Sequence, residues 1–506
     1  MCGRGDDAMT KLDDLALGAQ PQGRTLLTAD WVLGHGAGGH RLLPKGEVVV
    51  EGDRIIFVGH RFAGDVARRI DLGRSLISPG LIDLDALSDL DTTILGIDNH
   101  PGWAKGRVWP RSYVTRGPYE MYSFEELAFQ KRFAFAQLLL NGITTAAPIA
   151  SLFYREWGET VAEFTAAADA AGQLGLRVYL SPAYRAGGMV LEAPDRMEPV
   201  FDEARGLQGL TDAVAFIGEQ DGRFDGLVRG MLAPDRVETC TETLLRETDA
   251  AARDLGCKFR LHMAQGQMER DVVQRLHGTT APEWLAGLGL LSDRLIAPHA
   301  TNATESDLQH YADNGVSIVH CPLVSARGGG SALRSFGKVK ALGVNIAMGT
   351  DTSPPDMLLN LLTGLMAARI VDASPTAVSA ADMWDAATLG GAKALSRDDL
   401  GRLAPGAQAD IAVFGLDNAI MTPAIDPITT LVAGGSGKVT RAVFVGGRLS
   451  MRAGNVAGMD MVAAQAQAQA QFEGLVDKYP ERSWGHPPVS TLFPPSYPLQ
   501  TDARHD

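Results

Sequence analysis

Five short segments of the chain carry acidic or histidine side chains at the end of an apolar run. They are residues 79–87, 261–265, 297–300, 318–322 and 349–351. Imidazoles and carboxylates are common ligands of divalent metal ions, and both groups can transfer protons during a reaction. If the apolar runs are parallel strands, their carboxyl ends lie on one face and these groups form a single site.

The order of the surrounding segments predicts how such strands are positioned. Short apolar runs alternate with amphipathic stretches between residues 79 and 395, for example 125–140 followed by 142–145, and this alternation is typical of parallel βα units. We therefore predict an α/β fold, a (β/α)8 TIM barrel, over residues 79–395. Hairpin patterns at 24–78 and 396–460 predict a small β-sandwich built from both chain ends. The remaining parts are an N-terminal tail, 1–23, and a C-terminal helix with a proline-rich tail, 461–506.

Composition and charge restrict the class of protein and its partners. The chain has 506 residues, 45% of them hydrophobic, which suffices for a large buried core. A formal charge of −14 opposes binding to nucleic acid. The four cysteines form no CxxC pair, which makes a disulfide framework improbable, and the sequence shows no apolar stretch typical of a signal peptide or a membrane helix. We expect a cytoplasmic homo-oligomer with a small-molecule substrate and no membrane partner.

Together the five segments resemble the amidohydrolase superfamily. The first strand of that superfamily reads Pro-Gly-Leu/Phe-Ile-Asp-x-His-x-His, and this chain has Asp85 and Leu87 at the two final histidine positions. The later segments resemble the fifth, sixth, seventh and eighth strands, and residues 401–414 resemble the return into the small β-domain. The altered first strand is most similar to the divergent branch of molinate hydrolase and the phenylurea hydrolases, which is related to the chlorotriazine hydrolases.

The resemblance implies a metal site formed by Asp85, His262, His299 and Asp351. Two imidazoles and two carboxylates suit one divalent ion, with zinc as the first expectation and manganese, iron or cobalt as alternatives. Residues 226–234 contain no lysine that could bridge two metals, which favours a single ion. His100 remains open as a replacement ligand, and a chain that has lost its metal is the opposite alternative.

The resemblance also implies catalytic roles. Asp351 matches the aspartate that accepts a proton from the attacking water and passes it to the leaving group, and His299 is either a ligand or an electrostatic aid. His320 either polarises a substrate carbonyl or is a structural histidine at a strand end. Gln265 stands where ring deaminases of the superfamily have glutamate, and glutamine cannot protonate a ring nitrogen.

Aromatic residues predict the character of the substrate. Trp103 and Trp109 lie in a long loop after the first strand, and large rings beside a barrel opening suit an apolar, flat molecule. Packing of these rings on the barrel is the equally weighted alternative. The predicted substrate contacts are Gln265, His320, Trp103, Trp109 and Tyr184.

These features lead to one main functional hypothesis and two alternatives. The first is a metal-dependent hydrolase that cleaves a C–N bond of an amide, carbamate or urea. The alternatives are a deaminase of a nitrogen heterocycle and a catalytically silent barrel that acts as a binding or assembly protein.

Overall fold

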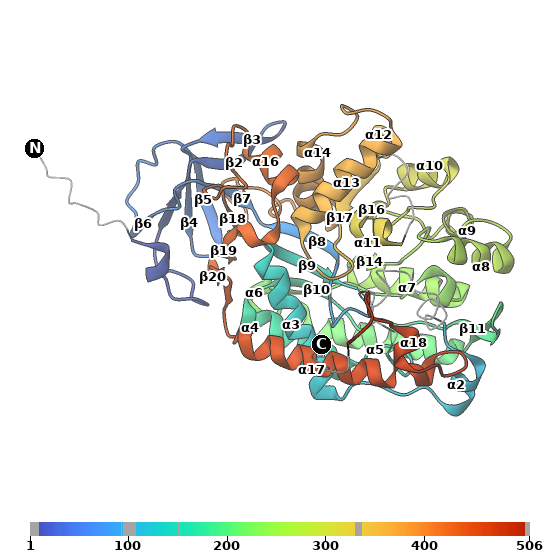
Figure 1. The fold of residues 1–506 in the computed structure, drawn as a ribbon. Coiled ribbons are helices and arrows are strands. Elements are labelled where there is room, and N and C mark those ends of the chain that lie inside the picture. The colour runs from blue at the N-terminus through green and yellow to red at the C-terminus, as the bar shows by residue number, and fades with distance from the viewer. Residues whose placement is uncertain are drawn as a thin grey trace, which may run out of the picture.

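The structure is a computed structural model that describes residues 10–92, 94, 108–149, 152, 154–328 and 336–500. A small β-domain lies at one end of the molecule, and a larger α/β domain occupies the rest (Figure 1). His100 and Trp103, which were singled out in the sequence, lie outside the described residues.

Strands from both parts of the sequence build the small domain. One sheet has the order β5-β4-β1-β6 and the other has the order β21-β20-β19-β18-β7-β2-β3. The late strand β18 lies between the early strand β7 and β19, antiparallel to both. Apolar side chains such as Leu27, Val48 and Val413 are buried in the core of this domain. The strands are β1 Thr25–Thr28, β2 Trp31–Gly36, β3 Gly39–Pro44, β4 Glu47–Glu51, β5 Arg54–Gly59, β6 Arg68–Asp71, β7 Ser75–Pro79, β18 Ile411–Gly415, β19 Thr440–Val445, β20 Arg448–Arg452 and β21 Asn455–Val456.

Eight parallel strands form the centre of the α/β domain. They make two four-stranded sheets, β13-β10-β9-β8 and β14-β15-β16-β17. A separate hairpin, β11 Gly187–Ala193 and β12 Arg196–Phe201, follows β10. The eight strands are β8 Leu81–Ala86, β9 Ile143–Pro148, β10 Arg177–Leu180, β13 Val228–Gly230, β14 Phe259–Arg260, β15 Leu295–Pro298, β16 Ser317–His320 and β17 Asn345–Met348.

Backbone contacts join the two sheets on both sides. Leu232 N donates to Lys258 O and Arg260 N donates to Leu232 O, next to β13 and β14. Beyond the last residues of β17, Asp351 N donates to Asp85 O of β8 at 2.7 Å. The carboxyl ends of strands from both sheets therefore lie around one place.

Helices cover the strands, and the sequence accounts for many of their ends. Ser123 and Glu126 form a capping box at the start of α3, and Gly175 adopts the left-handed conformation that ends α4. The helices are α2 Arg111–Arg116, α3 Phe124–Leu140, α4 Val161–Leu174, α5 Glu203–Gln220, α6 Arg223–Gly226, α7 Glu242–Leu255, α8 Gln267–His277, α9 Ala281–Leu288, α10 Glu305–Asn314, α11 Pro322–Arg327, α12 Phe336–Ala341, α13 Met357–Val371, α14 Ala380–Asp385, α15 Gly391–Ala394, α16 Pro427–Gly434, α17 Met461–Lys478 and α18 Val489–Leu492. Shorter turns are η1 Leu12–Asp14, η3 Val237–Thr239, η5 Gly437–Val439, η6 Tyr479–Arg482 and the π-helical η4 Ala386–Gly390.

The C-terminal helix α17 packs against α3 (Figure 1). In the part of the chain that the structure describes, no helix has both the length and the apolar character needed to cross a bilayer.

Candidate metal centre and active site

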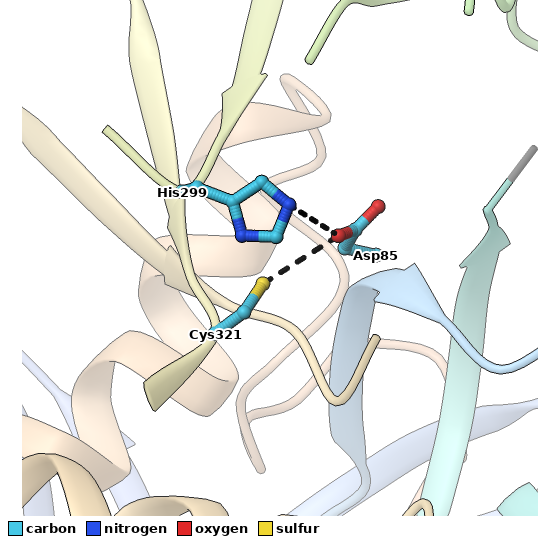
Figure 2. A group of neighbouring side chains, drawn as sticks. All are labelled: Asp85, His299 and Cys321. Carbon is cyan, nitrogen blue, oxygen red and sulfur yellow. Dashed lines mark hydrogen bonds and ion pairs between the residues drawn. The ribbon is translucent and has the colours of Figure 1, made fainter. Parts of the chain in front are cut away.

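Asp85 is the point at which the predicted site residues meet. It lies near the carboxyl end of β8 and is completely buried. Its Oδ1 lies 3.3 Å from Nε2 of His262, and its Oδ2 lies 3.7 Å from Nε2 of His299. Figure 2 shows the His299 ring and the Cys321 thiol directed at this carboxylate, and Cys321 Sγ donates to Oδ2 over 3.5 Å. Side chains from just beyond three other strands thus surround one carboxylate.

Asp351 lies just beyond β17, where the second sheet meets β8 of the first, and it belongs to the same group. One of its carboxylate oxygens, Oδ2, lies 3.7 Å from Nε2 of His299. Gly349 makes this close approach possible, because a Cβ at this position would lie only 2.7 Å from the Cβ of Asp85. The structure therefore brings together all four residues that were predicted as metal ligands.

The two ring nitrogens of His262 have different partners, the carbonyl oxygen of Asp235 at Nδ1 and the carboxylate of Asp85 at Nε2. Nδ1 of His262 lies 3.2 Å from the carbonyl oxygen of Asp235, which can only accept, so Nδ1 carries the proton. In the neutral ring Nε2 is then a lone-pair acceptor, and it points at Oδ1 of Asp85. Two acceptors in this position favour a cation between them, and a carbonyl partner on the outer nitrogen is usual for metal-binding histidines.

Several atoms of the group are buried without a hydrogen-bond partner. Within the described residues these include Oδ1 of Asp85 and both ring nitrogens of His299. Unpaired buried polar atoms are costly, so a cluster of them indicates a ligand that would satisfy them. Their nitrogen and oxygen chemistry fits a divalent transition metal.

The backbone of the site is held in unusual conformations. Ala264, His299, Ala300 and Asp351 all have positive φ angles, between 53° and 76°. Such conformations are unfavourable for residues other than glycine and cluster at functional sites. Here they turn the chain sharply beyond the ends of three strands.

Burial and neighbouring charges together set the protonation of the two acids. Burial alone would raise the pKa of Asp85, but His262, Arg260 and His299 outweigh it and hold that pKa well below its usual range. Burial and the neighbouring charge of Asp85 raise the pKa of Asp351 well above its ordinary value. Without a further cation the pair therefore favours one negative charge in place of two.

Two buried histidines of the site region are held in their neutral forms. Burial lowers the pKa of His299 to about 3 and the pKa of His320 to about 4. A neutral imidazole can bind a metal or accept a proton, but it cannot serve as an acid near neutral pH. His299 is therefore better suited to the ligand role than to proton donation.

The structure adds two residues that the sequence analysis did not select for the site. Arg260 is buried, donates to Ala147 O at 2.8 Å, and places Nη1 3.7 Å from Oδ1 of Asp85. Cys321 follows the predicted His320 in the sequence, and its thiol donates to the carboxylate of Asp85. A signal for Arg260 existed in the sequence, because residues 260 and 262 of one strand direct their side chains to the same face.

The other acids near the first strand have different partners. Asp83 accepts hydrogen bonds from the backbone nitrogen and the hydroxyl of Thr350, at 3.1 and 2.6 Å. Burial raises the pKa of Asp83 to about 7. Asp89 accepts from the hydroxyl of Tyr154, and Asp91 accepts from the backbone of Ser353. These contacts link strands and loops, and they leave Asp85 as the acid that faces the histidines.

His320 and Gln265, two of the predicted substrate contacts, lie close in sequence to the site. The first has a ring nitrogen without a partner in the described part of the chain, and the second is hydrogen-bonded through its side chain. His320 is buried at the end of β16, its Nδ1 has no partner among the described residues, and its ring lies 5.8 Å from that of Phe336. Gln265 lies just beyond His262, and its Oε1 accepts a hydrogen bond from Nη2 of Arg236 at 2.5 Å.

The aromatic residues mainly pack within the protein. The Trp109 ring lies 5.4 Å from that of Tyr113 and 4.9 Å from the Arg185 guanidinium, and it packs on a cluster that includes Leu475 of α17. The Tyr184 side chain is 2% exposed, and its hydroxyl bonds to Thr248 Oγ1 of α7 at 2.9 Å. Both rings therefore pack against helices. This is the alternative that the sequence left open, in place of contact with a substrate.

Known proteins resemble this chain over most of its length. A 5-methylthioadenosine/S-adenosylhomocysteine deaminase of Natronomonas pharaonis is 27% identical over 85% of this chain and 93% of its own. The corresponding deaminase of Halobacterium salinarum is 28% identical over 87% of this chain and 97% of its own. Among solved structures, the atrazine chlorohydrolase of Arthrobacter aurescens TC1 complexed with zinc has a TM-score of 0.73 at 23% identity, covering 88% of this chain and 99% of its own. An adenosine deaminase from Xanthomonas campestris with bound zinc has a TM-score of 0.72 at 22% identity, covering 89% and 98%.

These comparisons refine the expected branch of the superfamily. The relatives named are deaminases and a chlorohydrolase, whereas the sequence was interpreted as closest to molinate hydrolase and the phenylurea hydrolases. The finer placement therefore stays a prediction. The amidohydrolase family profile matches residues 111–450, the greater part of the chain. The chain therefore belongs to the amidohydrolase family and is an enzyme of the hydrolase class that acts on carbon–nitrogen bonds.

Proposed function

We propose that this protein is a metal-dependent hydrolase that cleaves the C–N bond of an amide, carbamate or urea in an apolar or aromatic small molecule. The observation that carries the proposal is the convergence of His262 and His299 on the buried Asp85, with Asp351 against the same His299 nitrogen. Family membership supports the choice of an enzyme over a silent binding protein.

Asp85, His262, His299 and Asp351 would hold the metal ion. The recorded separations between their facing atoms are 3.3 to 3.7 Å. Within the described residues, ligand atoms of Asp85, His299 and Cys321 lie within 4.8 Å of one another, and His262 and Asp351 each face one member of this group. The nitrogen and oxygen donors suit zinc first, and manganese, iron or cobalt as alternatives.

A divalent ion at this position would lower the pKa of a bound water and so supply the nucleophile at neutral pH. Asp351 would accept the proton of that water and donate it to the leaving nitrogen. This role suits a carboxyl that can hold a proton, and burial raises the pKa of Asp351 well above its ordinary value. His299 stays neutral and keeps its nitrogen available as a ligand.

A deaminase of a nitrogen heterocycle is the second candidate. Its support is the similarity to deaminases of 5-methylthioadenosine and S-adenosylhomocysteine. Gln265 argues against it, because a carboxamide, unlike a carboxylic acid, is not acidic enough to transfer a proton to a ring nitrogen. Ammonia release would identify the deaminase, and release of an organic amine would identify the amide, carbamate or urea hydrolase.

Metal content and product analysis test the proposal together. Protein purified without chelators should hold about one transition-metal ion per chain, and His262→Ala should lose it. The matched control is His60→Ala, because His60 is an exposed histidine of the small domain. Asp351→Asn should fold but lose turnover of anilides, carbamates and ureas by at least about a hundredfold. Full activity of Asp351→Asn, or metal retention in His262→Ala, would refute the mechanism.

A further inference from the structure

Arg236 and Gln265 form a rigid pair beside the candidate metal centre. Arg236 donates from Nε to Glu238 Oε1 at 2.8 Å and from Nη2 to Gln265 Oε1 at 2.5 Å. Glu238 is itself 4% exposed, so the salt bridge is partly shielded from water. The guanidinium is thereby fixed by two hydrogen bonds in different directions.

The backbone of Gln265 is equally well held. Its N–H donates to Glu269 Oε2 at 2.7 Å. Its carbonyl accepts from Thr301 Oγ1 at 2.5 Å and from Asn302 Nδ2 at 2.8 Å. The amide side chain therefore projects from a fixed position, three residues beyond the predicted metal ligand His262.

Both members of the pair are placed next to the metal ligands. Arg236 pairs with His262 in a parallel backbone bridge, and Val237 N donates to His262 O at 3.0 Å. Burial is the main influence on the pKa of both Asp351 and His299, and the positive charge of Arg236 lowers both. The guanidinium thus lies within electrostatic reach of the reacting groups.

The chemistry of arginine sets the orientation of the glutamine amide. A guanidinium has donors but no acceptor, so the amide atom that it contacts must be the oxygen. The Nε2 group of Gln265 is then left to donate elsewhere. Within the described residues, no hydrogen bond involves Gln265 Nε2 or Arg236 Nη1, and neither atom is among the buried polar atoms without a partner. Both donors therefore remain accessible.

We propose that Arg236 Nη1 and Gln265 Nε2 form a donor pair that binds a carbonyl oxygen of the substrate. This inference rests on the proposed function and deepens it, because it selects substrates by their acceptor. Two fixed donors favour an oxygen that carries partial negative charge, and they disfavour a group that carries a proton, such as a protonated ring nitrogen. Amides, ureas and carbamates have such an oxygen beside the scissile bond.

Equilibrium binding tests the donor pair without requiring that the protein hydrolyse the probe. The probes are phenylurea and phenylthiourea, which differ in an oxygen that accepts strongly and a sulfur that accepts weakly, titrated by calorimetry into metal-loaded protein. We expect the wild type to bind phenylurea about tenfold more tightly, a difference typical of hydrogen bonds to a charged donor. Gln265→Glu and Arg236→Met should each remove most of this preference, since the first replaces a donor by a carboxylate and the second removes the guanidinium.

Two further variants make the result specific. Gln465→Glu makes the same change at an exposed glutamine of α17 and should keep the full preference. Arg236→Lys keeps the charge without the fork-shaped donor set and should restore the preference only in part. An unchanged preference in Gln265→Glu would overturn the inference, as would a wild type that binds both probes equally or neither. A wild type that shows the preference but hydrolyses no amide would leave the donor pair standing and refute the hydrolase.

Discussion

Asp85 shows how much a single buried charge can organise. Two imidazoles, one guanidinium and one thiol lie within 3.7 Å of its two oxygens. In an interior of low dielectric constant such a carboxylate needs compensation by neighbouring hydrogen-bond donors and positive charges. Arg260 is the permanent positive charge beside it, and a metal ion would be the second.

Replacing Arg260 tests this division of charge. Arg260→Met should lower the free energy of unfolding of chelator-treated protein by about 3–5 kcal/mol, because it leaves Asp85 ionised and buried without its partner. Added zinc should recover part of the loss, since the ion compensates the same carboxylate. Arg260→Lys, which retains the charge, is the control and should lose much less. Thermal melting with and without zinc provides the measurement. If Arg260→Met lost the same stability with zinc as without it, Arg260 and the ion would not compensate the same carboxylate.

At the scale of elements, the site depends on how closely neighbouring strands approach. Gly80 precedes β8 directly and faces Thr144 of β9, and a Cβ on residue 80 would lie 2.1 Å from atoms of the Thr144 side chain. Gly349 has the corresponding function between β17 and β8, where it faces Asp85. Glycine at these positions lets β8 lie where its carboxylate can meet ligands from the other sheet.

A single methyl group should therefore disturb β8. We expect Gly80→Ala to lower the free energy of unfolding by about 1–3 kcal/mol, because β8 must move away from β9. Gly218→Ala in α5 is the matched control, since a Cβ there meets no atom within 4 Å. That change should stabilise the protein slightly, by about 0.5–1 kcal/mol. Urea denaturation of both variants gives the comparison, and a Gly80→Ala protein as stable as wild type would show that the strand spacing is not restrictive.

At the scale of the whole molecule, a buried ion pair joins the two domains. Arg177 of β10 donates from Nε and Nη2 to both oxygens of Asp410, at 2.8 and 3.1 Å. Asp410 precedes β18 of the small domain and also accepts from Gly446 N at 2.7 Å. Such a two-pronged buried contact makes it unfavourable for either domain to separate from the other.

Breaking this pair should cost more than breaking an exposed one. Arg177→Met should lower the free energy of unfolding by about 3–5 kcal/mol, since Asp410 is then a buried charge without its partner. The double variant Arg177→Met/Asp410→Asn should be less damaged than the single one, because it removes the unpaired charge. Arg24→Met, which breaks the exposed pair of Arg24 with Glu51, should cost less than about 1 kcal/mol. Calorimetry that showed equal losses for the two single variants would contradict a domain-joining role.

Much of this protein could be predicted from its sequence. Apolar runs that end in Asp or His, in a fixed order, identified the residues that meet at Asp85, because strand periodicity and chain order are local properties. The early and late strands of the small domain were also recognisable from their hairpin patterns. The replacement of imidazoles by Asp85 and Leu87 was evident from the sequence, and with it the question of how the metal site is completed.

Only the tertiary structure decided what surrounds those residues. Arg260 and Cys321 meet Asp85, and Arg236 orients Gln265, through contacts between different strands and loops whose geometry no local pattern records. Trp109 was expected beside a substrate, yet its cluster is completed by α17, a helix more than 350 residues later. Tyr184 points to α7 because the direction of a side chain beyond a strand depends on how the backbone turns there. Residue types and their order follow from the sequence alone, whereas the partners of each buried polar group follow from long-range packing.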